Sequence, residues 1–238
     1  MVYKKIFNKA CLQSMLAVSM LLLVSSCARK IHITHNSFAN IRSIPQGFAF
    51  NSSFAVETIN KETPMLAQEI AQKIGHILEN KGYVIKDDTH ADYYLIFDYD
   101  MEQSKKTVNV EKYIPGETIT SYGSVLSNGK AKIYEGQTHT PGSFVYVPEV
   151  HTFFTKSITI QVFDAQSYRQ QTKHEPLWQG SAVCCDEHDD LRDTLDYLLV
   201  TALKYFGRNT QKYIETTVSS DDKEVSTLRT ELFSLPKN

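Results

Sequence analysis

Two amphipathic helical segments, far apart in a sequence that is otherwise rich in strand patterns, constrain this fold most strongly. The first begins at Thr63-Pro64, a pair typical of a helix N-cap and first helical position, and ends at Gly82. The second begins after Asp189 or Asp190 and ends at Gly207. Each helix has one apolar face, made by Leu66, Ile70, Ile74, Ile77 and Leu78 in the first and by Leu191, Leu195, Leu198, Leu199, Ala202 and Phe206 in the second. Such faces have to be buried against another layer.

Alternating sequences between and around these helices predict strands. Residues 91–100 place Tyr93, Leu95, Phe97 and Tyr99 on one face and Asp98 and Asp100 on the other. Three further segments predict strands, namely Phe48–Phe50 (followed by a turn at 51–53), Phe153–Phe163 and Leu177–Cys184. The order of strand, helix, strands and helix predicts an α+β fold, in which two helices cover one face of a mostly antiparallel sheet.

The middle of the chain, about 101–150, differs from the rest. Regularly placed glycines and prolines interrupt polar and aromatic stretches there, which predicts an insertion of long strands or hairpins, or a partner-binding loop. Four tyrosines fall in or near it: Tyr113, Tyr122, Tyr134 and Tyr146. Tyrosines on such a segment provide large contact area at low entropic cost, so they are candidate partner-binding residues. The alternative is that they pack against their own hairpins or cover the sheet.

The N-terminus has the layout of a secretory signal. Three lysines precede a run of apolar residues that is too short to span a membrane. Val24-Ser25-Ser26-Cys27 then resembles the lipobox of bacterial lipoproteins, in which the cysteine is alkylated with diacylglycerol before cleavage. An ordinary signal peptide with a chance cysteine is the alternative. Because acyl chains contribute ~0.8 kcal/mol per buried CH₂, several chains would hold the protein stably at a membrane.

These patterns divide the chain into four parts. We expect a lipoprotein signal peptide at 1–26, a lipidated tether at 27–47, a single α+β domain at 48–215 with the insertion inside it, and a polar tail at 216–238. Ala28 follows the cysteine where a sorting aspartate would stand, which resembles an outer-membrane address. We therefore expect a lipid anchor in the outer membrane and a domain that faces the periplasm.

Charge and cysteine content exclude several classes. The chain has 25 basic and 27 acidic residues without a basic stripe, so we expect no nucleic-acid partner. Neighbouring Cys184 and Cys185 are expected on opposite faces of a strand, not in a disulfide. The acids at 186–190 are more typical of helix capping than of a metal site, and His32 and His35 are expected to be solvated residues of the tether. We predict no cofactor and no metal.

Several segments together resemble a family of bacterial envelope lipoproteins described only as domain of unknown function 4136. They are Cys27, Phe48-Ala49-Phe50, Lys81-Gly82-Tyr83, Ala91-Asp92-Tyr93, Trp178-Gln179-Gly180-Ser181-Ala182 and the C-terminal helix. The likeness runs from about Phe38 to Gly207 and implies an α+β fold in the envelope, with no catalytic residues to transfer. The long middle segment departs from it.

The sequence has none of the common catalytic motifs, so the main expectation is a non-catalytic lipoprotein. We expect it to be an accessory, scaffold or assembly component of a cell-envelope complex, for example one for secretion or export, with envelope proteins as partners. Two alternatives stay open. One is a periplasmic carrier or sensor of a small hydrophobic or glycan ligand. The other is an envelope hydrolase that uses acidic residues such as Asp98 and Asp100.

Overall fold

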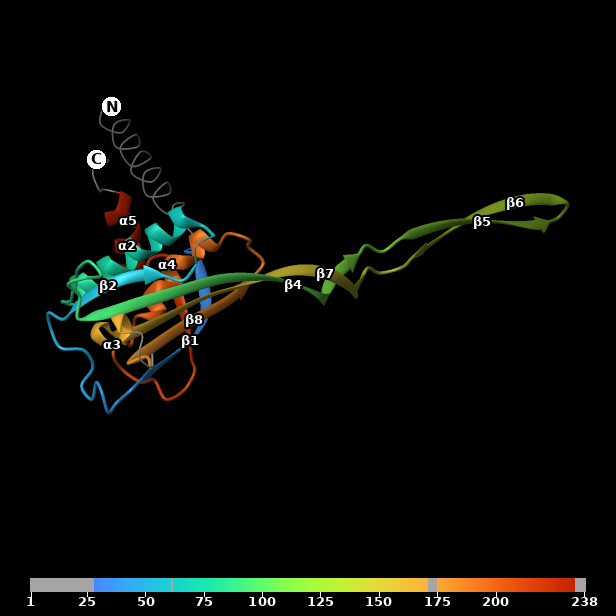
Figure 1. The fold of residues 1–238 in the computed structure, drawn as a ribbon. Coiled ribbons are helices and arrows are strands. Elements are labelled where there is room, and N and C mark those ends of the chain that lie inside the picture. The colour runs from blue at the N-terminus through green and yellow to red at the C-terminus, as the bar shows by residue number, and fades with distance from the viewer. Residues whose placement is uncertain (1–27, 61, 171–174, 234–238) are drawn as a thin grey trace, which may run out of the picture. The chain divides into compact units, whose positions relative to one another are not determined.

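The computed structural model describes residues 28–60, 62–170 and 175–233 (Figure 1). In chain order its elements are β1 (Lys30–Ala39), β2 (Ser53–Thr58), α2 (Pro64–Asn80), β3 (Val84–Ile85), β4 (Tyr93–Ile114), β5 (Thr118–Ser127), β6 (Lys130–His139), β7 (Ser143–Asp164), α3 (Ala165–Arg169), β8 (Trp178–Asp186), α4 (Leu191–Ala202), β9 (Ile214–Ser219) and α5 (Lys223–Phe233).

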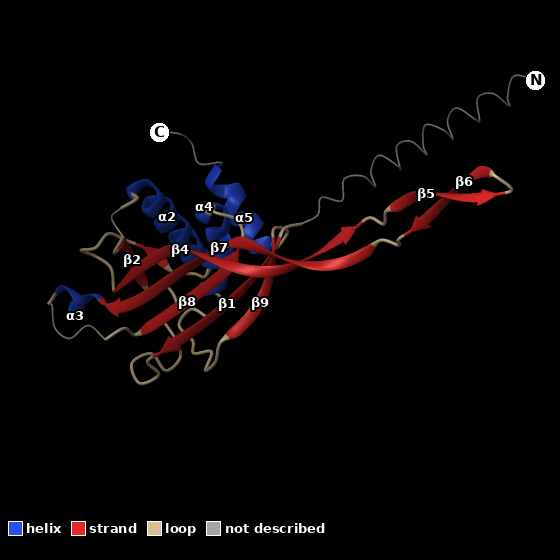
Figure 2. Cartoon of the chain, turned by 90° about the vertical axis from the view of Figure 1, so that its right-hand side faces the viewer, coloured by secondary structure: helices blue, strands red, loops and turns tan. Residues whose placement is uncertain are grey.

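The fold is α+β, as the pattern of elements predicts. Seven strands form one sheet in the order β3-β2-β4-β7-β8-β1-β9, and α2, α4 and α5 lie on one face of it (Figure 2). β1 pairs antiparallel with both β8 and β9, whereas β2 pairs parallel with both β3 and β4. The parallel pairs follow from the crossover through α2, because a helix between two strands returns the chain in the same direction.

The chain divides into two compact units. One, which we call the body, contains the described residues up to Asp100 together with Ser157–Cys184 and the chain from Leu191 onward. The other, which we call the ribbon, consists of Met101–Lys156 and Cys185–Asp190. β4 and β7 each run from one unit into the other, so the expected insertion is a continuation of two sheet strands.

The core of the body lies between the helices and the sheet. Leu95 and Phe97 are fully buried and Tyr99 nearly so, while Asp98 and Asp100 are exposed, which confirms the predicted faces of this strand. The predicted apolar stripes of α2 and α4 are also at the core, with Ile70, Ile74, Leu78, Leu195, Leu198 and Leu199 almost completely buried.

The expected tether over 27–47 is wrong for Lys30–Ala39, which form strand β1. Ile31 and Ile33 alternate into the core and are at most 5% exposed. His35 points the same way, is 2% exposed and stacks on Tyr205, so it is not a solvated residue. Burial lowers the pKa of His35, and the charge of Lys204 lowers it further. The fold therefore begins almost immediately after the cysteine, with the Arg29 carbonyl accepting a hydrogen bond from the Ser220 N–H.

Two other expectations about element positions are also wrong. Phe48–Phe50 is not a strand, because Phe48 turns into an aromatic cluster with Phe54 and Phe206 while Phe50 is 76% exposed. The strand follows the expected turn at 51–53 instead, as β2, which begins at Ser53. The expected polar tail contains most of β9 and all of α5, and its Val225 and Leu228 are buried.

Candidate functional site

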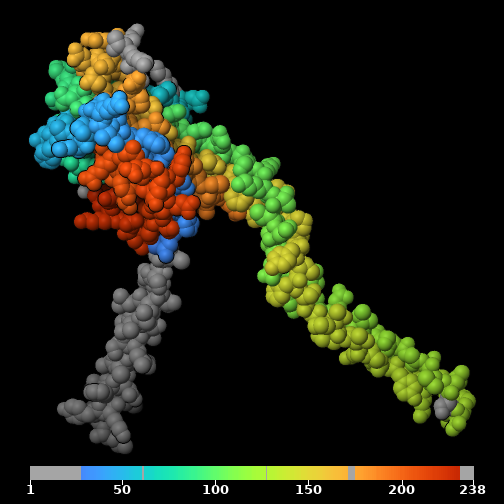
Figure 3. Space-filling view, turned by 90° about the horizontal axis from the view of Figure 1, so that it is seen from below, coloured from blue at the N-terminus to red at the C-terminus, as the bar shows by residue number. Residues whose placement is uncertain are grey.

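The middle of the chain forms one long antiparallel hairpin, whose strands lie against each other in Figure 3. β5 and β6 pair residue for residue from Thr118 opposite His139 inward to the turn. Asn128 and Gly129 make the connection with φ values of 56° and 73°. Positive φ at both central residues is the signature of a type I′ turn, whose twist matches that of the flanking strands.

A break divides the hairpin at Pro115-Gly116 on one strand and Pro141-Gly142 on the other. The backbones approach so closely here that a Cβ on Gly116 would lie 1.9 Å from the Thr140 carbonyl oxygen. The Thr140 N–H nevertheless donates to the Glu117 carbonyl at 2.9 Å, in the register of the pairs beyond it. The register of β5 and β6 therefore continues as far as Glu117 and Thr140, next to the break.

Below the break, toward β4 and β7, one face of the ribbon carries an exposed apolar stripe. The Tyr113 and Phe144 rings pack across the strands with their centroids 5.1 Å apart. Tyr146 and Val150 share the face of Phe144, because side chains two apart on a strand point the same way. These four side chains are between 57% and 70% exposed. We call them the stripe.

On the face of the ribbon opposite the stripe, charged side chains form ion pairs with one another. Lys112 and Glu149 form an ion pair of 2.5 Å, and His151 lies 2.7 Å from Glu187. The hydrogen bond from Lys112 lowers the pKa of Glu149, and the hydrogen bond to Glu187 raises the pKa of His151. Val145 and Val147, which alternate with the stripe, are only partly exposed. The two faces therefore differ, and the stripe is the face that lacks cover within the ribbon.

Above the break, both faces carry apolar side chains. Tyr122, Leu126 and Ile133 share one face by register, and Ile119, Val125 and Tyr134 share the other. All six are at least 55% exposed. β5 and β6 form a two-stranded sheet, so within the described part of the chain no third strand pairs with the outer edge of either strand.

The four tyrosines predicted as partner-binding residues are all exposed, from 55% for Tyr134 to 72% for Tyr122. The structure brings Tyr113 and Tyr146 together on the stripe and places Tyr122 and Tyr134 on opposite faces beyond the break. Sequence reasoning missed Phe144 and Val150. The signal that could have found them is strand alternation, because both residues stand an even number of positions from Tyr146 and so share its face.

The residues of the lipobox, Val24, Ser25, Ser26 and Cys27, lie outside the described residues, as does the expected signal peptide. Among the described residues no helix is long and apolar enough to cross a membrane. Cys184 is buried and Cys185 exposed, which confirms that the thiols point to opposite faces of β8. No group of three or more His, Cys, Asp or Glu side chains within 28–60, 62–170 and 175–233 could hold a metal ion.

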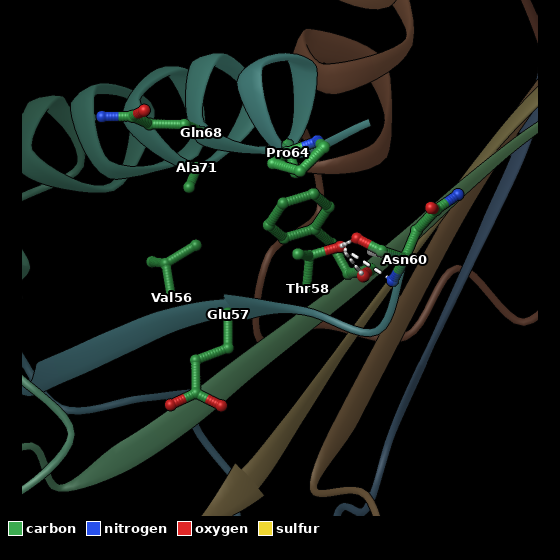
Figure 4. Close-up of a pocket in the computed structure, with 9 residues that line it drawn as sticks. Val56, Glu57, Thr58, Asn60, Pro64, Gln68 and Ala71 are labelled. Atoms are coloured by element: carbon green, nitrogen blue, oxygen red, sulfur yellow. Dashed lines mark hydrogen bonds between the residues drawn. The ribbon is translucent and has the colours of Figure 1, made fainter. Parts of the chain in front are cut away.

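The body has a cavity of about 550 Å³ between β2 and the beginning of α2. Val56 and Thr58 point from the strand toward Pro64 and Ala71 of the helix, whereas Glu57 points away (Figure 4). Its apolar walls and few polar groups suit a small, largely hydrophobic molecule. Asp98 and Asp100, the acids considered for hydrolysis, do not line it and stand on the sheet face opposite the core.

An α+β body whose central strands extend into a long hairpin defines the class of this protein. The chain belongs to the family described as Domain of unknown function (DUF4136), whose model matches residues 35–206 and so spans the whole ribbon and much of the body. No curated protein matches the chain. Among solved structures it is similar to a PDZ domain protein from Parabacteroides distasonis, with 14% identity and a TM-score of 0.41 over 87% of this chain. The match spans only 43% of that protein.

Proposed function

We propose that this chain is a non-catalytic lipoprotein of the bacterial cell envelope, anchored by lipid on Cys27, that binds another envelope protein through the stripe. The observation that carries the proposal is the stripe itself, four large apolar side chains on one face of the ribbon. Exposed apolar patches on a folded protein mark interaction sites. An accessory or assembly role in an envelope complex follows from an anchor and a binding surface without catalytic motifs.

The physics of a two-stranded ribbon supports a partner. An isolated hairpin is marginally stable in water, because each strand has a neighbour on one side only and no layer covers its faces. Burying side chains such as Phe144 and Tyr146 contributes roughly 1.5–3 kcal/mol each before the cost of association. The unpaired outer edges of the strands could add main-chain hydrogen bonds to a strand of the partner.

Site-specific photo-cross-linking tests the stripe. A photoreactive amino acid at Tyr146 or Phe144 should cross-link one defined envelope protein in cells of the native organism. The same amino acid at Val147 or Val145 is the matched control, since these neighbours lie on the opposite face of the same strand. Equal yields from both faces, or a cross-link from neither, would contradict a partner that docks on the stripe.

The lipid anchor is tested separately with Cys27→Ala. We expect the wild type in the outer-membrane fraction, with its domain on the periplasmic side and protected from added protease in intact cells. The Cys27→Ala variant should leave that fraction and lose the Tyr146 cross-link because the domain is no longer held near its partner. A variant that stays in the membrane fraction would show that something other than lipid on Cys27 holds it there.

A second candidate function rests on the cavity between β2 and α2. Its size and apolar walls would suit a carrier or sensor of a small hydrophobic ligand. Native mass spectrometry of protein purified from its own envelope should then show an adduct. Ala71→Trp fills the cavity and should remove the adduct, whereas substitution of exposed Met65 should not. A bare wild-type mass would rule this function out.

A further inference from the structure

The end of the hairpin differs from the stripe in where its apolar side chains lie. Within four positions of the turn, Leu126 and Ile133 occupy one face and Val125 the other, with exposures of 79%, 75% and 56%. A flat protein surface could cover only one of these faces at a time. A fluid phase that surrounds the tip would cover both.

The positive charge near the turn indicates what kind of fluid phase would surround the tip. Lys130 and Lys132 flank the turn on one strand, and both are exposed. Between Glu117 and Glu135 the chain has no acidic residue. Lysines can keep their ammonium groups at the level of phosphates while their stems cover apolar surface. The tip therefore combines apolar side chains with a net positive charge.

Tyrosines follow directly behind the tip. Tyr122 and Tyr134 lie on opposite faces, six and five positions from the turn, and the acid Glu135 stands opposite Tyr122. Tyrosine prefers the boundary between an apolar and a wet environment. The order along the ribbon is thus apolar, then aromatic, then acidic, which matches the change in polarity from the acyl region of a lipid leaflet to water.

We propose that the tip of the hairpin, residues 125–133, binds the surface of an anionic phospholipid membrane by shallow insertion. The four strand positions from the turn to Ile133 extend about 13 Å, so at the roughly 5–10 Å reached by interfacial protein segments Ile133 would lie at the boundary with water. Deeper insertion is disfavoured, because the unpaired outer edges of both strands would leave backbone groups without partners in hydrocarbon. This contact uses a different surface from the stripe and does not depend on the proposed protein partner.

Leu126→Trp in the full-length chain reports on the tip. Native Trp178 is 1% exposed in the core and gives a constant background. The chain is reconstituted into vesicles of phosphatidylcholine alone or with an equal amount of phosphatidylglycerol. In one arm the brominated lipid is in these vesicles, and in the other arm it is in a second vesicle population added afterwards. With phosphatidylglycerol present, we expect the fluorescence of the introduced tryptophan to shift to the blue and to be quenched in at least one of the two arms. Thr107→Trp, on the exposed lower ribbon, should show neither change.

Charge and apolarity are then varied separately. Replacing Lys130 and Lys132 with glutamine should weaken partitioning about fivefold per lysine on phosphatidylglycerol vesicles. Ile133→Ser should weaken it about tenfold, and since Ile133 is 75% exposed the fold should not change. Absence of quenching in both arms would overturn the proposal. A blue shift without lipid that grows with protein concentration would also overturn it, in favour of contact between two copies of the tip.

Discussion

Tyr113 and Phe144 face each other across the two strands of the ribbon, with their ring centroids 5.1 Å apart and more than half of each side chain in solvent. The Tyr113 side chain also fills the space beside Gly142, so that a Cβ there would lie 2.1 Å from the tyrosine hydroxyl. The two rings therefore hold the strands together just below the break, and they are the first residues of the stripe.

Removing either ring should loosen the ribbon at this level. Cross-strand aromatic pairs contribute roughly 0.5–1 kcal/mol beyond their buried area. We expect Tyr113→Ala and Phe144→Ala each to speed hydrogen exchange of nearby backbone amides, and the double variant to cost about 0.5 kcal/mol less than the two single changes together. Strictly additive effects on exchange would mean that the rings do not stabilise each other.

The type I′ turn should set the stability of the hairpin end. Gly129 has a φ of 73°, so Gly129→Ala introduces strain of about 1 kcal/mol and should increase hydrogen exchange in β5 and β6. Gly123→Ala is the matched control, because a Cβ there meets nothing within 4 Å and the backbone is extended. Equal effects of the two changes would indicate that the turn geometry is not limiting.

Replacing each of two glycines of the body with alanine should change the free energy of unfolding in opposite directions. In Gly180→Ala the new Cβ would lie 2.3 Å from the Trp178 ring and 2.9 Å from the Ala202 carbonyl oxygen, so we expect a loss of about 2 kcal/mol. In Gly75→Ala, inside α2, the Cβ would make an ordinary 3.5 Å contact with Ile85. The free energy of unfolding should therefore rise by about 1 kcal/mol. Urea denaturation measures both, and the same sign for both would contradict this packing.

A buried ion-pair network joins the three helices on the sheet. Asp196 of α4 lies 2.7 Å from Lys73 of α2 and 3.0 Å from Arg229 of α5, and the Asp196 and Lys73 side chains are below 10% exposure. Asp196→Asn leaves a buried ammonium group with one partner fewer, and we expect a loss of about 3 kcal/mol in urea denaturation. Arg192→Ala breaks an exposed pair with Glu69 and should cost less than about 1 kcal/mol. A small effect of Asp196→Asn would mean that water reaches the network.

The His151–Glu187 pair gives the ribbon a pH dependence. Its hydrogen bond raises the histidine pKa in the folded state above the usual value near 6.5. The stabilisation is therefore complete at pH values below the unfolded-state pKa and is lost as the pH rises through the folded-state pKa. In an NMR titration, Glu187→Gln should lower the His151 pKa toward its usual value, whereas Glu135→Gln should not change it. An unshifted His151 in the wild type would contradict the contact.

How far the fold could be predicted depended on how local its signals are. α2 was predictable because Pro64, the apolar face of the helix and Gly82 all lie within one segment. β1 was not, because its alternation is short and a polar sequence surrounds it, and what fixes the strand is pairing with β8 and β9 from the far end of the chain. Phe50 shows the opposite error, an apolar residue in an alternating triplet that stays exposed.

The candidate site followed the same rule. The tyrosines could be named from their place among glycines and prolines, but which of them share a face depends on register. The register of β5 and β6 is set by the turn at Asn128-Gly129, which has a local signal, whereas the close approach of the strands at Gly116 has none. Phe144 joins the stripe through its contact with Tyr113, thirty-one positions earlier in the chain, which no local pattern contains.

Because β5 and β6 pair in one register from Thr118 opposite His139 to the turn, this part of the hairpin can change its length only in particular steps. Loss of two residues from each strand would shorten it by about 7 Å and leave every side chain on its original face. Loss of one residue from each strand would exchange the two faces beyond the deletion, turning Leu126 and Ile133 to the side now held by Lys130 and Lys132. Members of this family whose hairpins differ in length should therefore differ by an even number of residues in each strand.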